Sequence, residues 1–130
     1  MTNSIPMPVE LRERSVNGVM ILCPERGLKG RGEAVLRERL DRLVREGKLE
    51  ILIDLQQMPF VDSTELGRLI RCHISVRNAG GRVRLCNLSP RVITLMKMSR
   101  LDTLLEIYDT EDEALAVIVQ QREQQSDSKT

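Results

Sequence analysis

Two stretches decide how this chain folds: Ile51-Leu52-Ile53-Asp54-Leu55 and, after a short loop, Asp62-Ser63-Thr64-Glu65-Leu66-Gly67. The first is almost wholly aliphatic, which is typical of a strand buried on both faces of a sheet. The second starts with residue types that favour a helix start, and apolar residues then recur at helical spacing up to Arg77. The sequence therefore predicts a strand and a helix joined by the loop Gln56 to Val61.

The same alternation of strand and helix continues on both sides of this unit. Before it, an amphipathic helix is predicted from Glu33 to Arg45, and Gly47 ends that helix. After it, Gly80-Gly81 ends the helix that follows the loop. The remaining predictions are a strand from Val83 to Leu88, a helix from Pro90 to Met98 capped by Ser89, a strand from Leu105 to Tyr108, and a helix from Glu111 to Val119.

The chain begins with a predicted β-hairpin. Val9 to Arg14 and Val19 to Cys23 are short strand candidates, and Asn17-Gly18 between them favours a tight turn. Strands that alternate with helices need right-handed crossovers, which produce a parallel sheet. We therefore expect a single α/β domain with a mixed, mostly parallel β-sheet, an initial hairpin and about four α-helices. Sites in such sheets gather at the carboxyl ends of strands, which nominates the loop Gln56 to Val61.

Composition suggests one domain with two polar ends. The chain has 130 residues, of which 41% are hydrophobic, enough for a modest core. We expect residues 1–8 to be a flexible amino-terminal segment, residues 9–119 to form the domain, and residues 120–130 to be a polar, disordered tail.

Charge and aromatic content argue against nucleic acid and membranes as partners. Twenty basic residues oppose nineteen acidic ones, and with one Phe, one Tyr and no Trp the chain lacks stacking platforms for single-stranded nucleic acid. No apolar run approaches the length of a spanning helix, and the start of the chain does not resemble a secretory signal. We expect a cytoplasmic protein that is a monomer or a weak homodimer.

Neither a metal site nor a catalytic centre is favoured. Cys23, Cys72 and Cys86 have aliphatic neighbours and no metal-ligand spacing, so we interpret them as reduced core residues. The only histidine, His73, is ten residues from Ser63, too far along a helix to serve as its base. Gly27, Gly30 and Gly32 fit neither the dinucleotide-binding nor the P-loop spacing, so a flexible loop is preferred over an anion site there. We expect no catalytic residues, no metal and no cofactor.

Asp62 and Glu65 have the spacing of a capping box, in which each side chain accepts from the other's backbone amide. If Asp62 caps the helix, Ser63 takes the first helical position and its hydroxyl is not needed for capping. A phosphate on Ser63 would then lie at the positive end of the helix, beside two carboxylates. On the next helix, Met96 and Met98 could be either core residues or part of an exposed apolar patch for a protein partner.

These residues resemble the STAS family, and within it the bacterial anti-sigma factor antagonists. In that family a strand ends in an apolar turn followed by Asp-Ser-(Ser/Thr)-Gly-Leu-Gly, and this chain has Phe60-Val61-Asp62-Ser63-Thr64-Glu65-Leu66-Gly67. The likeness continues through Asn78-Ala79-Gly80-Gly81, Ser89-Pro90 with its helix, and Met98-Ser99, and it covers about Val9 to Ile118.

The resemblance implies an anti-sigma factor antagonist that binds an anti-sigma factor and so releases a sigma factor. It also implies that the same anti-sigma factor acts as a serine kinase on Ser63, that phosphorylation ends the binding, and that a PP2C-type serine phosphatase restores it. By the same resemblance, the partner-binding residues would be Asp62, Ser63, Thr64, Glu65 and Gly30.

Two departures from the family pattern leave an alternative open. Glu65 replaces a glycine of the family motif, and Gly30 stands where an aspartate of the first loop belongs. The alternative is an unswitched STAS scaffold module in a larger bacterial signalling assembly, in which Ser63 and Thr64 only begin a helix.

Overall fold

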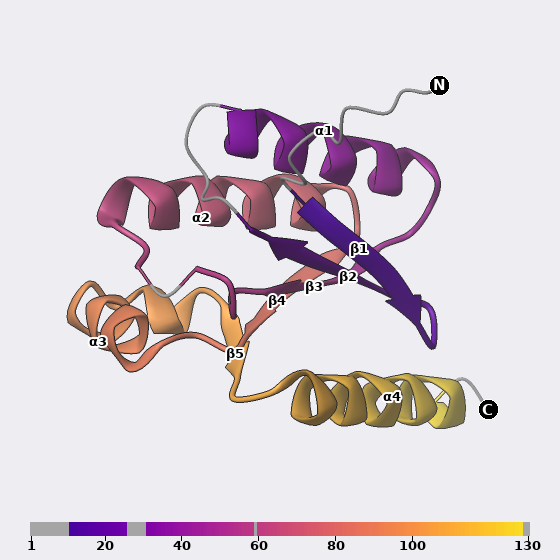
Figure 1. Ribbon diagram of the computed structural model, residues 1–130. Coiled ribbons are helices and arrows are strands. Elements are labelled where there is room, and N and C mark those ends of the chain that lie inside the picture. Colours follow the sequence, from indigo (N-terminus) through magenta and orange to yellow (C-terminus); the bar gives the residue numbers. More distant parts are fainter. Residues whose placement is uncertain (1–10, 26–30, 59, 129–130) are drawn as a thin grey trace, which may run out of the picture.

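The computed structural model describes residues 11–25, 31–58 and 60–128 (Figure 1). A single five-stranded sheet has the order β1-β2-β3-β4-β5, with β1 antiparallel to β2 and the other neighbours parallel. In chain order the elements are β1 (Leu11–Val16), β2 (Val19–Pro24), α1 (Arg31–Arg45), β3 (Glu50–Asp54), α2 (Ser63–Asn78), β4 (Arg82–Cys86), α3 (Pro90–Met98), a 3-10 turn (Leu101–Thr103), β5 (Glu106–Tyr108) and α4 (Glu111–Ser128).

The sheet separates two layers of helices. Helices α1 and α2 lie side by side over one face, and α4 lies against the other face (Figure 1). Helix α3 packs at the side of the sheet where β5 lies, and its buried residues Val92 and Met96 join the core beneath α1 and α2. The predicted α/β architecture with four helices and an initial hairpin is confirmed.

The hairpin turn has the backbone that its sequence predicts. Asn17 and Gly18 have φ values of 51° and 79°, and Val16 pairs with Val19 across the turn. Two consecutive left-handed residues are the signature of a type I′ turn, which matches the twist of the strands it joins. Strand β1 runs to Val16 instead of ending at Arg14, and the predicted strand residues Val9 and Glu10 lie outside the described part of the chain.

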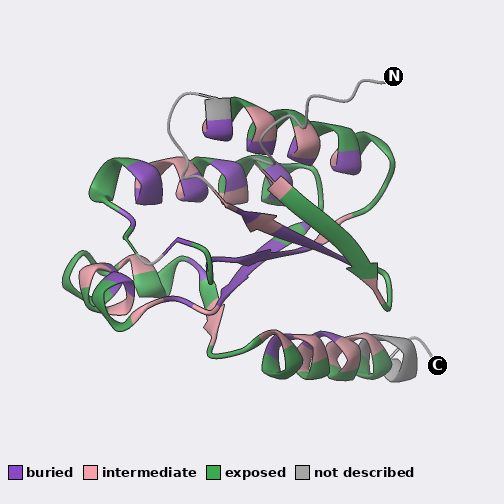
Figure 2. Cartoon of the chain, viewed as in Figure 1, coloured by how far each residue is buried: buried purple, intermediate pink, exposed green. Residues whose placement is uncertain are grey.

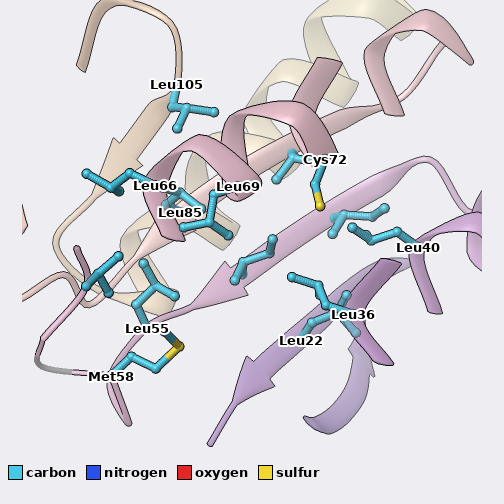
Figure 3. Packing of buried hydrophobic residues seen from close by; sticks show 14 of the residues in the cluster. Leu22, Leu36, Leu40, Leu55, Met58, Leu66, Leu69, Cys72, Leu85 and Leu105 are labelled. Carbon is cyan, nitrogen blue, oxygen red and sulfur yellow. The ribbon is translucent and has the colours of Figure 1, made fainter. Parts of the chain in front are cut away.

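The core is aliphatic and unequal on the two faces of the sheet. The larger cluster lies under α1 and α2, and Figure 3 shows leucines from β2, β4, both helices and the loop after β3 meeting there. The smaller cluster lies under α4 and consists of Val19, Ile21, Leu52, Cys86, Ala114 and Ile118. Figure 2 shows the central strands almost wholly buried between these layers. This accounts for the continuous apolar run in β3.

The end of α2 depends on two glycines, as predicted. Gly80 has a φ of 92°, which a side chain would strain, and it follows directly on the last turn of the helix. A Cβ on Gly81 would lie 2.7 Å from the Leu49 carbonyl oxygen, so only glycine fits where the chain enters β4.

The last helix is longer than the sequence predicts. We expected α4 to end near Val119, but it continues to Ser128, through residues that composition had placed in a polar tail. Two of those polar residues make specific contacts. The Gln121 side-chain oxygen accepts a hydrogen bond of 2.6 Å from Arg84, and Arg122 donates to the Asn17 carbonyl oxygen in the hairpin turn. These contacts hold this part of α4 against β4 and the hairpin turn.

Smaller differences occur at other element ends. Helix α1 begins at Arg31, two residues before the predicted start, and β3 ends at Asp54 instead of Leu55. Strand β4 runs from Arg82 to Cys86 instead of Val83 to Leu88, because Asn87 adopts a left-handed φ of 57° that ends the strand. Strand β5 begins at Glu106, one residue later than predicted.

One charged side chain is buried in the middle of the sheet. Arg84 on β4 faces α4 and is only 1% exposed. Its guanidinium donates to Glu50 on β3, to Glu106 on β5 at 2.7 Å and to Gln121 on α4. A single side chain therefore joins three strands and a helix, and every partner is polar, as a buried charge requires. Among the described helices, none is long and apolar enough to cross a membrane.

Candidate functional site

The loop after β3 is anchored by the strand's last residue. Asp54 is 3% exposed, and its carboxylate accepts hydrogen bonds from the Gln56 amide at 2.8 Å and from the Asn87 side chain at 3.1 Å. Asn87 follows the neighbouring strand β4, so the contact joins the carboxyl ends of two parallel strands. The loop that leads to the predicted site thus starts from a residue that hydrogen bonds hold in place at the carboxyl end of β3.

The described residues in the rest of this loop include both buried and exposed side chains. Met58 and Val61 are buried and join the main core, which holds the loop against the sheet. Phe60 between them is 68% exposed, and the Arg91 guanidinium carbon of α3 lies 5.2 Å from the centre of its ring. This cation–π contact places an exposed aromatic ring against α3, close in sequence to the start of α2.

The predicted capping box at the start of α2 is confirmed. The Asp62 carboxylate accepts from the Glu65 amide at 2.8 Å, and the Glu65 carboxylate accepts from the Asp62 amide at 3.2 Å. Asp62 has the extended backbone of an N-cap residue, with φ −89° and ψ 176°. Asp62 therefore carries out the capping of this helix.

Ser63 occupies the first position of α2, as its place after the cap predicts. Both Ser63 and Thr64 are exposed. Their amides precede the first hydrogen bond of the helix, so they add to the partial positive charge at its end. The chain thus presents a serine hydroxyl to solvent at a position that favours an anionic group.

The other predicted partner-binding residues that the structure describes fall into two environments. Asp62 and Thr64 are exposed beside Ser63, whereas Glu65 is only 7% exposed because its carboxylate turns back to the cap. Gly30 lies outside the described residues. The structure therefore brings Asp62, Ser63 and Thr64 together on one surface and places Glu65 beneath it.

Helix α3 resolves the two interpretations of its methionines. Met96 is 0% exposed and belongs to the core, whereas Met98 is 79% exposed at the end of the helix. The prediction of Ser89 as N-cap is confirmed, since its hydroxyl accepts from the Val92 amide at 3.2 Å. One methionine stabilises the fold, and the other is free to contact a second surface.

Sequence reasoning missed the carboxyl pair beneath the loop. Hydrogen bonding to Asp54, together with burial, raises the pKa of Glu111 at the start of α4, while the ion pair with Arg14 opposes that rise. The signal that could have found Asp54 is a carboxylate at the end of an otherwise aliphatic strand.

The cysteines and the histidine are not arranged as a reactive site. Cys72 and Cys86 are buried and Cys23 is half-buried, and none forms a disulfide within the described residues. His73 lies ten residues along α2 from Ser63, about 15 Å at the rise of an α-helix. Over the described part of the chain, no group of His, Cys, Asp and Glu side chains has the arrangement of a metal site.

The buried carboxylate of Glu65 gives a stability prediction. Glu65→Gly removes one half of the capping box and adds a poor helix former, so we expect the free energy of unfolding to fall by about 1–2 kcal/mol. Glu65→Gln keeps an oxygen that can accept from the Asp62 amide and should lose less than half as much. Urea unfolding of the three proteins measures the difference, and equal stability of wild type and Glu65→Gly would show that the capping contact contributes nothing.

Comparison with known proteins places this fold and loop in one family. The STAS domain model matches residues 13–114, which is most of the chain. An anti-sigma F factor antagonist of Paenibacillus polymyxa is 27% identical over 110 residues, covering 84% of this chain and 94% of that protein. This chain belongs to the STAS domain family, and its relatives include proteins named as anti-sigma factor antagonists.

Solved structures agree with that assignment. The crystal structure of a candidate anti-sigma factor antagonist from Thermotoga maritima superimposes with a TM-score of 0.73 at 25% identity, covering 82% of this chain and 92% of that one. The phosphorylated form of the Bacillus cell-fate determinant SpoIIAA gives a TM-score of 0.64 at 19% identity, covering 83% and 98%. The second likeness shows the shared fold.

Proposed function

We propose that this protein is an anti-sigma factor antagonist whose binding is switched off by phosphorylation of Ser63. The observation that carries the proposal is the position of Ser63, which is exposed at the first residue of α2 while Asp62 performs the capping. The names of the relatives support an anti-sigma factor as the partner. Release of a sigma factor follows from competition for that partner.

The local charges support a switch at this position. A phosphate on Ser63 would add a charge of about −1.5 to −2 next to the free amides of the first turn, which favours it. The Asp62 carboxylate beside the phosphate repels it. Because the two effects oppose each other, we expect phosphorylation to change the stability of the helix little. A docked protein, in contrast, would have to bury this new charge, which costs several kcal/mol unless a cation meets it.

The partner surface in this proposal surrounds the start of α2. It comprises Asp62, Ser63 and Thr64, with Phe60 and its Arg91 neighbour beside them in the loop and on α3. Glu65 supports this surface from beneath. The kinase would be the anti-sigma factor itself, and a PP2C-type phosphatase would restore the unmodified form.

The acceptor residue can be identified by mapping the phosphate. Incubation with the cognate anti-sigma factor and ATP should add one phosphate, located on Ser63 by peptide mass spectrometry. Ser63→Ala should remain unmodified, and Thr64→Ala, the matched control one residue along the same helix, should be modified as fully as wild type. Phosphate on Thr64, or full modification of Ser63→Ala, would contradict the assignment.

The second candidate is a scaffold role without a phosphorylation switch. It is favoured by the structural role of Glu65, which completes the capping box at the helix start. Its carboxylate fills the place that glycine holds in the family motif and stabilises the helix start. In a scaffold, the protein would bind its partner but would show no modification in the same incubation. Binding without phosphate transfer would therefore favour the scaffold.

A further inference from the structure

A groove between α1 and α2 is separate from the Ser63 surface and has no role in the proposed switch. It has a volume of about 280 Å³, close to the lower end of the range of about 300–1,000 Å³ for small-molecule sites. Its lining comes from α1, between Glu33 and Arg45, and from α2, between Arg68 and Val76, together with the C-cap residue Ala79. Figure 1 shows these helices side by side over the same face of the sheet.

The floor of this groove is apolar. Leu40 of α1 and Cys72 and Val76 of α2 line it, and each is less than a tenth exposed. Figure 3 shows Cys72 on α2 lying opposite Leu40 on α1. Burial raises the pKa of the Cys72 thiol to about 11, so at neutral pH the floor carries no charge. A ligand body that contacts this floor must be apolar.

The rim of the groove is strongly basic. Four arginines line it against two carboxylates, Glu33 and Asp41, which leaves a local charge of +2 in a chain whose net charge is only +1. Arg68 and Glu33 form an ion pair of 2.8 Å that joins the two helices. The exposed side chains of Arg37 and Arg71 stand on opposite walls, one on each helix, and neither forms an ion pair within the described residues.

The spacing of charges on α1 would allow its arginines to pair with Asp41. Asp41 lies four residues after Arg37 and four before Arg45, the spacing at which opposite charges pair on a helix, yet the described structure contains no such pair. Guanidinium groups without an ion-pair partner present forked donors that match the oxygens of a carboxylate or a phosphate.

We propose that the α1–α2 groove binds a small amphipathic anion, with its hydrocarbon body on the Leu40–Cys72–Val76 floor and its phosphate or carboxylate head between Arg37 and Arg71. The volume suits a compact small molecule. Both parts of the ligand are required, because the floor offers no polar group to a bare anion and the rim offers charge only to an anionic head.

Octyl phosphate, used below its micelle concentration, is a suitable probe. Titration into ¹⁵N-labelled protein should shift amide signals of α1 and α2 around Leu40 and Val76. Inorganic phosphate and octanol, which supply the head and the body separately, should each bind at least about tenfold more weakly. Equal binding of octanol would show that the arginines have no role, and shifts confined to the Phe60 and Met98 region would place binding elsewhere; either result overturns the proposal.

Charge variants test the rim. Arg37→Ser/Arg71→Ser should weaken octyl phosphate binding about tenfold or more, because two charge-assisted contacts are lost. The control Arg42→Ser/Lys97→Ser removes the same charge from exposed positions that do not line the groove, and should retain wild-type affinity. All four positions are exposed, so the fold should persist, and circular dichroism checks this. Equal affinity of the two double variants would contradict the proposed site.

Thiol alkylation gives a second readout inside the groove. Octyl phosphate should slow alkylation of Cys72 by iodoacetamide, since the ligand body covers it, and should leave the rate at Cys23 unchanged. Equal protection of both cysteines would indicate general stabilisation, and an unchanged rate at Cys72 would show that the floor is not covered. Both results would overturn the placement of the ligand.

Discussion

Arg84→Ala is expected to lower the free energy of unfolding by about 3 kcal/mol and the melting temperature by about 10 °C. The substitution removes a side chain that is 1% exposed and that joins Glu50, Glu106 and Gln121. It also leaves Glu50 without its cation and Glu106 with only the more distant guanidinium of Arg82. Because both remain partly exposed, at 31% and 44%, the expected loss is at the lower end of the range for a broken buried ion pair.

Arg82 supplies the matched control for this prediction. It lies on the same strand and contacts the same carboxylate, with 3.6 Å between its guanidinium and Glu106, but its side chain is 52% exposed. Exposed ion pairs contribute about 0–1 kcal/mol, so Arg82→Ala should change stability by less than 1 kcal/mol. Thermal and urea unfolding of the two variants make the comparison. A similar loss of unfolding free energy in both variants would show that the burial of Arg84 does not increase its contribution to stability.

The same cluster predicts how the effect of Arg84 depends on pH. Burial acts to raise the pKa of Glu106, but hydrogen bonding and the charge of Arg84 outweigh it and hold that pKa below its ordinary value of 4.5. A carboxylate whose pKa is lowered by folding stabilises the fold at a pH above its pKa in the unfolded chain. That contribution is lost as the pH falls through its pKa in the folded protein. The difference in stability between wild type and Arg84→Ala should therefore narrow below pH 4.5. A constant difference down to pH 3 would contradict the ion pairing.

Phosphorylation of Ser63 is expected to weaken binding of the anti-sigma factor by about 100-fold or more. A phosphate within a docked surface would bring a charge of about −1.5 to −2 into the interface, where burying it without a matching cation is costly. Ser63→Asp, which carries one charge, should weaken binding by a smaller factor. Ser63→Ala, which keeps a small neutral side chain at the first turn, should bind about as tightly as wild type.

Much of the fold was predictable because its signals are local. The capping box of Asp62 and Glu65, the cap at Ser89 and the left-handed turn at Asn17 depend on residues within a few positions of one another. Their side chains and backbone angles act on the nearest amides, so the sequence order determines them. The position of Ser63 at the start of α2 followed from the same local chemistry.

The missed features depend on contacts between distant residues. Arg84 finds its partners 22 to 37 positions away, and Asp54 binds Asn87 across two strand ends. The extension of α4 likewise rests on Arg122 reaching a turn 105 positions earlier. A charged residue in an apolar strand indicates where such a contact forms. Its partners can be identified only when the order of the strands in the sheet is known.

The methionines of α3 and the burial of Glu65 show the same limit on a smaller scale. Met96 and Met98 are two residues apart on a helix of nine residues, and which one faces the core depends on how the helix rests on the sheet. Glu65 was grouped with the partner-binding residues because of its place in the motif. Its carboxylate turns back to accept a hydrogen bond from the Asp62 amide and is buried there.

Calorimetric titration of the anti-sigma factor tests most directly whether Ser63 is a phosphorylation switch. The titration compares unmodified protein, protein phosphorylated at Ser63, and the same sample after treatment with a PP2C-type phosphatase. If Ser63 is the switch, we expect tight binding, a loss of about 100-fold, and full recovery, in that order. Unchanged affinity of the phosphorylated protein would contradict it, because the start of α2 would then lie outside the surface that the partner binds.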